Sequence, residues 1–281
     1  MKLSGSEIFW ETLVKEGVET VFGYPGGGIM PIYHVMLDYP IHHVLSRHEQ
    51  GAVHMADGFA RAGGKVGVAL ATSGPGATNM VTGIATAMLD SSPIVCITGQ
   101  VVGKLLGYDA FQEVDTSGIT LPITKHNYMV TDIQELGQVL REAFYIARTG
   151  RPGPVLVDIP KDVQIAEIDW EYSDAPVYLP GYKFRPPKLK NQLDVALEMI
   201  QNARKPIILA GQGVLLSNAF QELRQFAEKA QIPVTTTLLG IGSFPASHPL
   251  NLGNIQMPRF ICPDTNSAPL NLKINLMLHW K

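Results

Sequence analysis

The sequence predicts an α/β protein with a doubly wound, mostly parallel sheet, followed by a partial second α/β domain. Two observations predict this fold class. Short apolar runs alternate with stretches of helical periodicity along the chain, which is the pattern of elements that builds a parallel sheet. The run 66–71 is apolar on both faces, as expected for a strand buried between two layers of helices.

The first expected element is a helix near the N-terminus. Ser4 and Glu7 have the spacing of a capping box, in which each residue satisfies a backbone amide of the helix start. The apolar residues of 8–13 share one helical face, and Gly17 is placed to end the helix.

Five apolar runs are expected to form strands of the first sheet: 20–22, 42–45, 66–71, 94–98 and 155–159. Ligands of such sheets bind outside the carboxyl ends of the strands. The loops that could carry chemistry are therefore those that follow four of these strands, after Phe22, Leu45, Ala71 and Thr98.

Composition divides the chain into four parts, and the first, 1–163, is the doubly wound domain. Residues 164–190 lose the periodicity and are rich in proline, which predicts a linker. Residues 191–253 carry a second, partial α/β pattern, with helices expected over 193–200 and 219–230 and strands over 206–210 and 233–236. The tail 254–281 departs from this pattern, as a shifted reading frame or an unrelated ending would, and its alternating residues 270–278 predict an isolated strand.

Composition and charge argue against several classes of protein. The 281 residues are 46% hydrophobic and 17% charged, enough for one or two ordinary cores. The formal net charge is -3 and the sequence has no block of like charge, so it offers no basic patch that would attract nucleic acid or anionic lipid. Because the sequence has no 18-residue apolar stretch, no leader pattern and only two cysteines, we expect a cytoplasmic protein that binds neither nucleic acid nor membrane.

Two glycine-containing loops follow strands. The three glycines of 24–28 would let the backbone approach a ligand closely, although a flexible turn explains a glycine run equally well. The loop 73–79 resembles a dinucleotide fingerprint, but Asn79 stands where the third glycine belongs and no suitably placed acid follows. It could still line a ligand with helix N-terminal amides and the Asn79 side chain.

A cluster of histidines around Glu49 invites a metal interpretation: His42, His43, His48 and His54. Zincin geometry needs His-Glu-x-x-His on one helix face, and Ala52 occupies the final position, so the spacing argues against zinc. Taken alone, Glu49 is a favourable acid in the first turn of a helix. Its place beside two glycine loops at neighbouring strand ends instead suggests a carboxylate that shares a proton with a ligand ring nitrogen.

Six segments resemble, in order and spacing, the large catalytic subunit of the acetolactate synthase (acetohydroxyacid synthase) family of thiamine diphosphate enzymes: 24–27, 47–52, 72–79, 99–101, 109–113 and 150–155. The resemblance runs from about Leu3 to Leu252 and implies a pyrimidine-binding domain for 1–163 and a central, FAD-binding-type domain for 191–253. The Arg-His-Glu and Ser-Gly-Pro-Gly loops are shared with other thiamine diphosphate enzymes, whereas Ala110–Glu113 is more particular to acetolactate synthases.

The family decarboxylates pyruvate and transfers the hydroxyethyl group to a second 2-oxo acid, pyruvate or 2-oxobutyrate, in branched-chain amino acid (isoleucine and valine) biosynthesis. The resemblance implies that Glu49 bonds N1′ of the aminopyrimidine and thereby promotes loss of the thiazolium C2 proton, and that Gln112 reaches the active centre. It also implies which residues surround the pyrimidine: Tyr24, Pro25, Gly26, Thr72, Pro75 and Asn79.

The family also binds FAD, and the resemblance carries that contact onto Arg151, Gly211, Gly213, Thr237 and Leu238. It implies a homodimer or tetramer, with a possible regulatory small subunit. The Gly-Asp-Gly motif with which the family holds Mg²⁺ and the diphosphate does not occur in this sequence, so we expect no metal ligand here and a truncated chain that is inactive alone. The alternatives are a non-catalytic dimerising module, or another thiamine diphosphate enzyme such as a sulfoacetaldehyde acetyltransferase or a pyruvate oxidase.

Overall fold

The computed structural model describes residues 2–182 and 190–255. The chain forms two compact units, Met1–Arg185 and Pro186–Lys281, here called the first and second unit. Each unit is described by itself.

The first unit is built on a six-stranded sheet in the order β3-β2-β4-β5-β7-β6. Every pairing within this sheet is parallel, as the two-sided apolar runs predict. Its strands are β2 (Thr20–Gly23), β3 (His42–Leu45), β4 (Gly67–Ala71), β5 (Ile94–Gln100), β6 (His126–Met129) and β7 (Val155–Pro160). The expected strands are thus confirmed to within about two residues, and β6 is additional.

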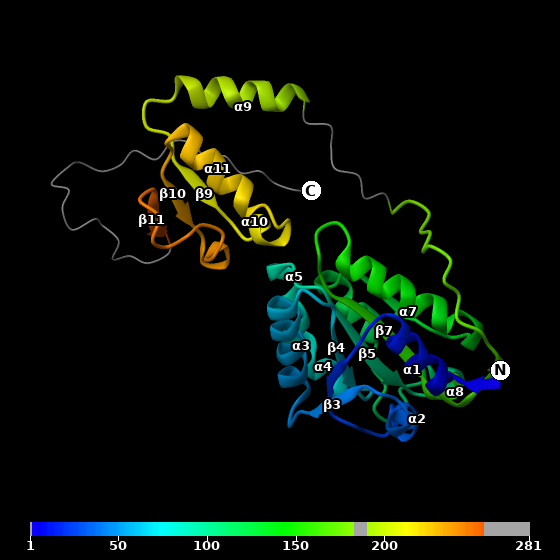
Figure 1. The fold of residues 1–281 in the computed structure, drawn as a ribbon. Helices are drawn as coiled ribbons and strands as arrows, with labels where there is room; N and C mark the ends of the chain where they lie inside the picture. The colour runs from blue at the N-terminus through cyan, green and yellow to red at the C-terminus, as the bar shows by residue number, and fades with distance from the viewer. Residues whose placement is uncertain (1, 183–189, 256–281) are drawn as a thin grey trace. The chain divides into compact units, whose positions relative to one another are not determined.

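Helices cover both faces of the sheet, with α3 and α5 on one face and α1 and α7 on the other (Figure 1). The long helices are α1 (Gly5–Lys15), α3 (Glu49–Gly63), α5 (Val81–Asp90) and α7 (Ile133–Arg148), and the short ones are α2 (Met30–Val35), α4 (Pro75–Asn79), α6 (Thr116–Thr120) and α8 (Lys161–Ile165). Successive residues of β4 enter opposite cores, since Val68 and Leu70 pack with α1 and α7 whereas Ala69 and Ala71 pack with α3 and α5. The sheet is therefore buried on both sides.

The start of α1 follows the expected capping box. The Ser4 side chain accepts from the backbone of Glu7, and the Glu7 carboxylate accepts from the Ser4 backbone 2.7 Å away. The helix ends at Lys15, and Gly17 adopts a φ of +78°, the conformation expected of a terminating glycine.

The structure differs from the expected linker 164–190 over much of its length. β8 (Glu167–Asp169) pairs antiparallel with β1 (Lys2–Ser4), and the Tyr182 hydroxyl donates to the backbone carbonyl of Thr149 at 3.1 Å. Composition does not predict this strand pairing, because β8 contains a single apolar residue, Ile168. Its partner strand β1 lies at the N-terminus, far away in the sequence. The first unit consequently extends beyond 163.

The second unit contains a three-stranded parallel sheet in the order β11-β10-β9. Its elements are α9 (Lys190–Asn202), β9 (Ile208–Ala210), α10 (Gly213–Leu216), α11 (Phe220–Ala230), β10 (Val234–Thr236) and β11 (Asn251–Asn254). Within the part of this unit that the structure describes, four buried apolar residues cluster into a core: Ala210, Ala227, Val234 and Phe244. The isolated strand expected over 270–278 lies outside the described residues.

No helix within residues 2–182 and 190–255 is both long enough and apolar enough to cross a membrane.

Candidate functional site

Three loops meet where the order of the sheet reverses. β2 has β3 on one side and β4 on the other. The chain therefore adds β3 on one side of β2 and then places β4 and β5 on the opposite side. In open parallel sheets this reversal opens a crevice outside the carboxyl ends of the strands. The loops after β2, β3 and β4 all begin at that edge, and they carry most of the residues expected from the sequence.

Glu49 is the first residue of α3 and comes directly after the loop that leaves β3. The His48 ring nitrogen Nδ1 accepts from the backbone N–H of Gln50 at 3.2 Å, which fixes where the helix begins. Glu49 is only 7% exposed although it opens the helix. Its Oε2 accepts from Nδ2 of Asn79 at 2.9 Å, so two of the expected site residues from different strand ends are directly joined.

Close approach at Gly76 leaves the Glu49 carboxylate facing backbone rather than a side chain. A Cβ atom at Gly76 would lie 2.7 Å from Cγ2 of Thr72 and 3.4 Å from Oε1 of Glu49. Glycine at this position therefore allows the start of α4 to pack closely on Thr72 beside the carboxylate. Asn79 occupies Oε2, and Oε1 has no protein hydrogen-bond partner in the described part of the chain.

The glycine loop after β2 packs directly on Thr72. The backbone N–H of Gly28 donates to Oγ1 of Thr72 at 2.9 Å. A Cβ at Gly26 would lie 2.6 Å from Cβ of Thr72, so a larger residue there would push the loop away from β4. Gly26, Thr72, Gly76 and Glu49 thus form one continuous wall.

The remaining expected pyrimidine residues lie on the same rim. Tyr24 follows β2, donates from its backbone N–H to Leu70 O at 3.3 Å and is 43% exposed. Pro25 is half-buried in the loop after Tyr24, and Pro75 is an exposed residue in the first turn of α4. Because these side chains are exposed or half-buried, they line the open edge of the crevice and do not enclose a cavity.

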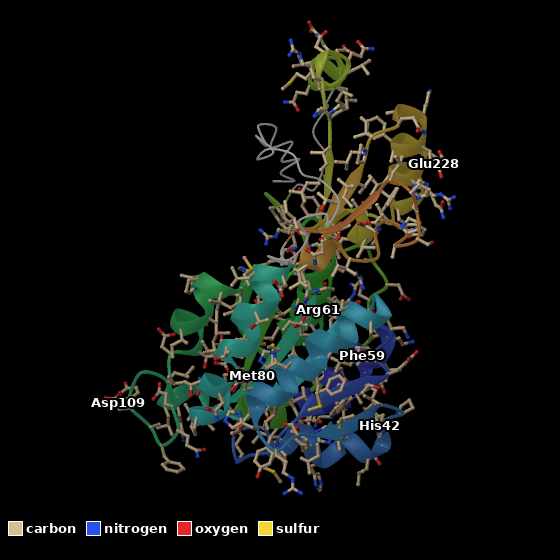
Figure 2. All side chains as sticks on the ribbon, turned by 90° about the vertical axis from the view of Figure 1, so that its left-hand side faces the viewer. His42, Phe59, Arg61, Met80, Asp109 and Glu228 are labelled. Atoms are coloured by element: carbon tan, nitrogen blue, oxygen red, sulfur yellow. The ribbon has the colours of Figure 1, made fainter. Side chains whose placement is uncertain are left out.

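Gln112 reaches the site from a different direction, on the long segment between β5 and α6. Its backbone has a φ of +59°, and its carbonyl group lies so close to Gly74 that a Cβ there would be 2.6 Å from the Gln112 oxygen. Figure 2 shows Asp109, a few residues earlier, at the tip of a loop that projects from the body of the first unit. The structure therefore brings the Gln112 backbone to the loop that carries Asn79.

Arg151 lies at the other edge of the sheet. It precedes β7, at the amino ends of the strands, where its Nε donates to Oγ of Ser91 at 2.7 Å and its Nη2 to Leu89 O at 3.0 Å. A cation that donates to the last carbonyls of α5 is a C-terminal cap. The first unit does not bring Arg151 to Glu49.

The other residues expected to contact FAD belong to the second unit. Gly211 and Gly213 bracket the turn from β9 to α10, and the Thr237 backbone N–H donates to Ala210 O at 3.0 Å. Leu238, which follows Thr237, is 56% exposed. These residues gather around the carboxyl end of β9, as the strand-turn-helix pattern predicts.

No group of three histidine, cysteine, aspartate or glutamate side chains that could hold a metal ion is present within residues 2–182 and 190–255. The His43 ring instead forms a 3.2 Å hydrogen bond with the Tyr33 hydroxyl, and the His48 ring caps α3.

Two features near the site were not anticipated from the sequence. Tyr33 is half-buried with its hydroxyl close to Gly23, and the pKa of Tyr33 is raised mainly by desolvation and to a smaller extent by the Glu49 charge. Asp158 is fully buried on β7, and burial raises the pKa of its carboxyl to about 7. An aspartate inside the apolar run 155–159 was the available signal for the second.

Two family models match this chain. The family described as "Thiamine pyrophosphate enzyme, N-terminal TPP binding domain" matches residues 3–119, and "Thiamine pyrophosphate enzyme, central domain" matches residues 193–266. The two matches therefore fall on the two units in the order in which the family places them.

Among curated proteins, the chain is similar to acetolactate synthase large subunits. It is 52% identical over 257 residues to the "Probable acetolactate synthase large subunit" of Methanocaldococcus jannaschii, covering 91% of this chain and 44% of the relative. The large subunit of Corynebacterium glutamicum is 51% identical over 253 residues, 90% of this chain and 40% of the relative, and that of Lactococcus lactis is 50% identical over 251 residues, 89% and 44%. The chain thus spans less than half the length of these relatives.

Proposed function

Because the chain belongs to the thiamine pyrophosphate enzymes and carries their N-terminal and central domains, we propose that its first unit binds the aminopyrimidine ring of thiamine diphosphate at the Glu49 crevice. The observation that carries this proposal is the buried Glu49 carboxylate, whose Oε2 is held by Asn79 and whose Oε1 lies beside Gly76. The activity proposed for the whole enzyme is that of an acetolactate synthase.

The residues fit the ring chemically. A flat aromatic ring needs walls with little side-chain bulk, and Gly26 and Gly76, which both pack against Thr72, add no side chain to the wall beside Glu49. A ring nitrogen needs a partner for a shared proton, and Oε1 of Glu49 is free to be that partner. Asn79 fixes the carboxylate so that its second oxygen keeps one direction.

When bound, thiamine diphosphate supplies the carbanion chemistry that decarboxylates a 2-oxo acid and transfers the hydroxyethyl group to another. The part of Glu49 is to hold a proton at the N1′ atom of the ring. A carboxylate held in a mostly buried crevice interacts with that proton more strongly than one in water, because the local dielectric constant is lower. Pyruvate is the proposed donor substrate, with pyruvate or 2-oxobutyrate as acceptor, in the synthesis of isoleucine and valine.

The proposals for FAD, Mg²⁺ and partners rest on the family. Arg151 caps α5 in the first unit, and the turn after β9 leads into α10, a helix of four residues, in the second unit. Mg²⁺ and the diphosphate would be held by residues other than those described. A homodimer or tetramer, a small regulatory subunit and a cytoplasmic location complete the proposal.

Binding of thiamine to the full chain tests the site. We expect NMR shift changes on adding thiamine that are confined to the loops 24–28 and 72–79, including the side-chain amide of Asn79. Glu49→Gln should weaken this binding, because a neutral amide cannot share the proton in the same way. Glu19→Gln is the matched control, since Glu19 is an exposed glutamate paired with Lys65 at 2.7 Å. Equal binding by the Glu49 and Glu19 variants would refute the assigned role.

Turnover tests the proposed activity. A chimera that carries residues 1–252 in place of the matching part of the Methanocaldococcus jannaschii relative should form acetolactate from pyruvate with thiamine diphosphate, Mg²⁺ and FAD. Glu49→Gln in the chimera should slow this reaction by about 10²–10⁴-fold, the usual contribution of a positioned acid-base group. The 281-residue chain alone should form none, and sustained product from it would contradict the proposal that it supplies only part of the site.

A further inference from the structure

A buried carboxylate outside the crevice connects the sheet to the segment that carries Gln112. Asp158, Thr98 and Gln100 are all fully buried at the carboxyl ends of β7 and β5. Oδ1 of Asp158 accepts from the Thr98 hydroxyl at 2.7 Å, and Oδ2 accepts from Nε2 of Gln100 at 3.0 Å. The Thr116 hydroxyl donates to the backbone carbonyl of Val114 at 3.4 Å.

Gln100 transmits this contact to the chain beyond β5. Its Nε2 has two hydrogens, and while one is donated to Asp158, the other is donated to the backbone carbonyl of Val114 at 3.2 Å. Its Oε1 accepts from the backbone N–H of Val101 at 2.9 Å. The Gln100 amide is therefore fixed at both ends, and an amide rotated by 180° would set an oxygen against two acceptors.

Val114 stands two residues after Gln112, whose backbone is in the left-handed region and packs on Gly74. A non-glycine residue persists in that region only where its surroundings hold it. On the outer side, the Glu113 carboxylate accepts from the backbone N–H groups of Gly107 and Ala110 and closes the projecting loop. The Val114 carbonyl is the point where this loop is bound to the buried sheet.

We propose that Asp158 is a positioning residue, which orients Gln100 so that its amide holds Val114 and sets Gln112 against Gly74 at the edge of the crevice. This inference rests on the proposed function, in which Gln112 serves the thiamine diphosphate site. Asp158 lies on β7, within the sheet, and does not contact the crevice. Two side-chain donors, Thr98 and Gln100, offset part of the cost of burying this carboxyl, and its role is to select one position of the loop through Gln100.

The anchor does not require a charged carboxyl. A proton on Asp158 would reside on the oxygen that faces Thr98, because the Thr98 hydroxyl can turn to accept whereas Nε2 of Gln100 can only donate. The other oxygen then still accepts from Gln100. An asparagine at 158 can reproduce this arrangement, with its oxygen toward Gln100 and its amide toward Thr98, but a leucine cannot.

Hydrogen exchange of the full chain without any cofactor tests the proposal. The amides of Tyr108, Glu113 and Thr116 are hydrogen-bonded within the segment, and peptides covering 103–116 are compared with peptides covering the buried strand β4. Gln100→Met and Asp158→Leu should speed exchange of the segment about tenfold relative to β4, the effect of losing one hydrogen bond. Asp158→Asn should keep the ratio near that of the parent chain.

Thr98→Val is the matched control. It removes the other donor to Asp158 but leaves the hydrogen bond from Gln100 to Val114 in place. It should therefore lower the exchange protection of residues 103–116 and of β4 by the same factor, and leave the ratio of their exchange rates unchanged. An unchanged ratio in Gln100→Met, or an equal rise in Thr98→Val, would overturn the proposal. The Gln100 and Thr98 variants decide the outcome even where Asp158→Leu fails to fold. Failure here leaves thiamine binding untouched, and failure of thiamine binding leaves the exchange result standing, so the two are distinguishable.

Discussion

Polar side chains at the carboxyl edge of the first sheet are held by partners from a different strand end. Asn79 after β4 holds Glu49 after β3, and Thr98 on β5 holds Asp158 on β7. Each link joins two loops or strands that the chain reaches many residues apart. A polar residue at this edge therefore has two roles. It offers a polar group to a ligand or a neighbouring side chain, and it fixes the relative position of two strand ends.

Asp158 makes the stability of the first unit depend on pH. Burial raises the pKa of its carboxyl from 3.8 to about 7, so the folded chain binds a proton that the unfolded chain has lost between those values. The corresponding stabilisation is complete below pH 3.8 and is lost as the pH rises through 7. It is on the order of a few kcal/mol, because each pKa unit corresponds to about 1.4 kcal/mol.

Asp158→Asn isolates this contribution, since the amide does not titrate. We expect the unfolding free energy of the parent chain, measured by urea denaturation and expressed relative to the variant, to fall steadily between pH 4 and pH 8. Other titrating groups cancel in that difference. A difference that is independent of pH would show that the Asp158 carboxyl keeps its ordinary pKa in the folded chain.

At the scale of elements, the sequence predicts what depends on local pattern. The strands of 20–22, 42–45 and 94–98 are predicted by apolar runs, and the start of α1 by its capping box. β6 is missed because His126–Met129 has neither an apolar run nor alternation, and it forms by pairing with β7. β8 is missed for the same reason, since it depends on β1.

The same distinction between local pattern and long-range contact applies to the residues of the site. Glu49 and Asn79 can be placed from the loops that follow their strands, but the hydrogen bond between them depends on the strand order, which puts β3 and β4 on either side of β2. The anchor of Gln112 depends on Val114 meeting Gln100, and no sequence pattern encodes that contact. The roles of Gln112 and Arg151 came from the family resemblance, and they stay predictions.

Arg151 offers a test at the scale of one helix. Arg151→Met removes the donors to Leu89 O and Ser91 Oγ at the end of α5, and we expect a loss of about 0.5–1 kcal/mol, the low end for hydrogen bonds because the side chain is exposed. Thermal unfolding without flavin measures it, with Lys104→Met as the control on another basic residue. An unchanged melting temperature would contradict the capping role, and a loss seen only with FAD present would assign Arg151 to flavin binding instead.

At the scale of the whole molecule, the two units differ in how much apolar surface each buries. Both large hydrophobic clusters lie within the first unit, on opposite faces of its sheet. Within residues 190–255 the second unit has one cluster of four buried apolar residues, and α9 exposes more than half of Leu193, Val195, Leu197 and Met199. Small cores supply little net stability, because conformational entropy opposes nearly all of what burial contributes.

The first unit should therefore fold alone. We expect residues 1–185 to unfold in one cooperative transition, at a temperature close to that of the main transition of the full chain, and to keep the NMR signal of the Asn79 side-chain amide. A second piece, 186–255, should show no cooperative transition, because the cluster of four buried residues found within 190–255 is too small to offset its loss of chain entropy. Circular dichroism melts of the two pieces and the full chain measure both. A 1–185 piece that melts without cooperativity would mean that the first unit, and with it the Glu49 crevice, needs the rest of the chain to form.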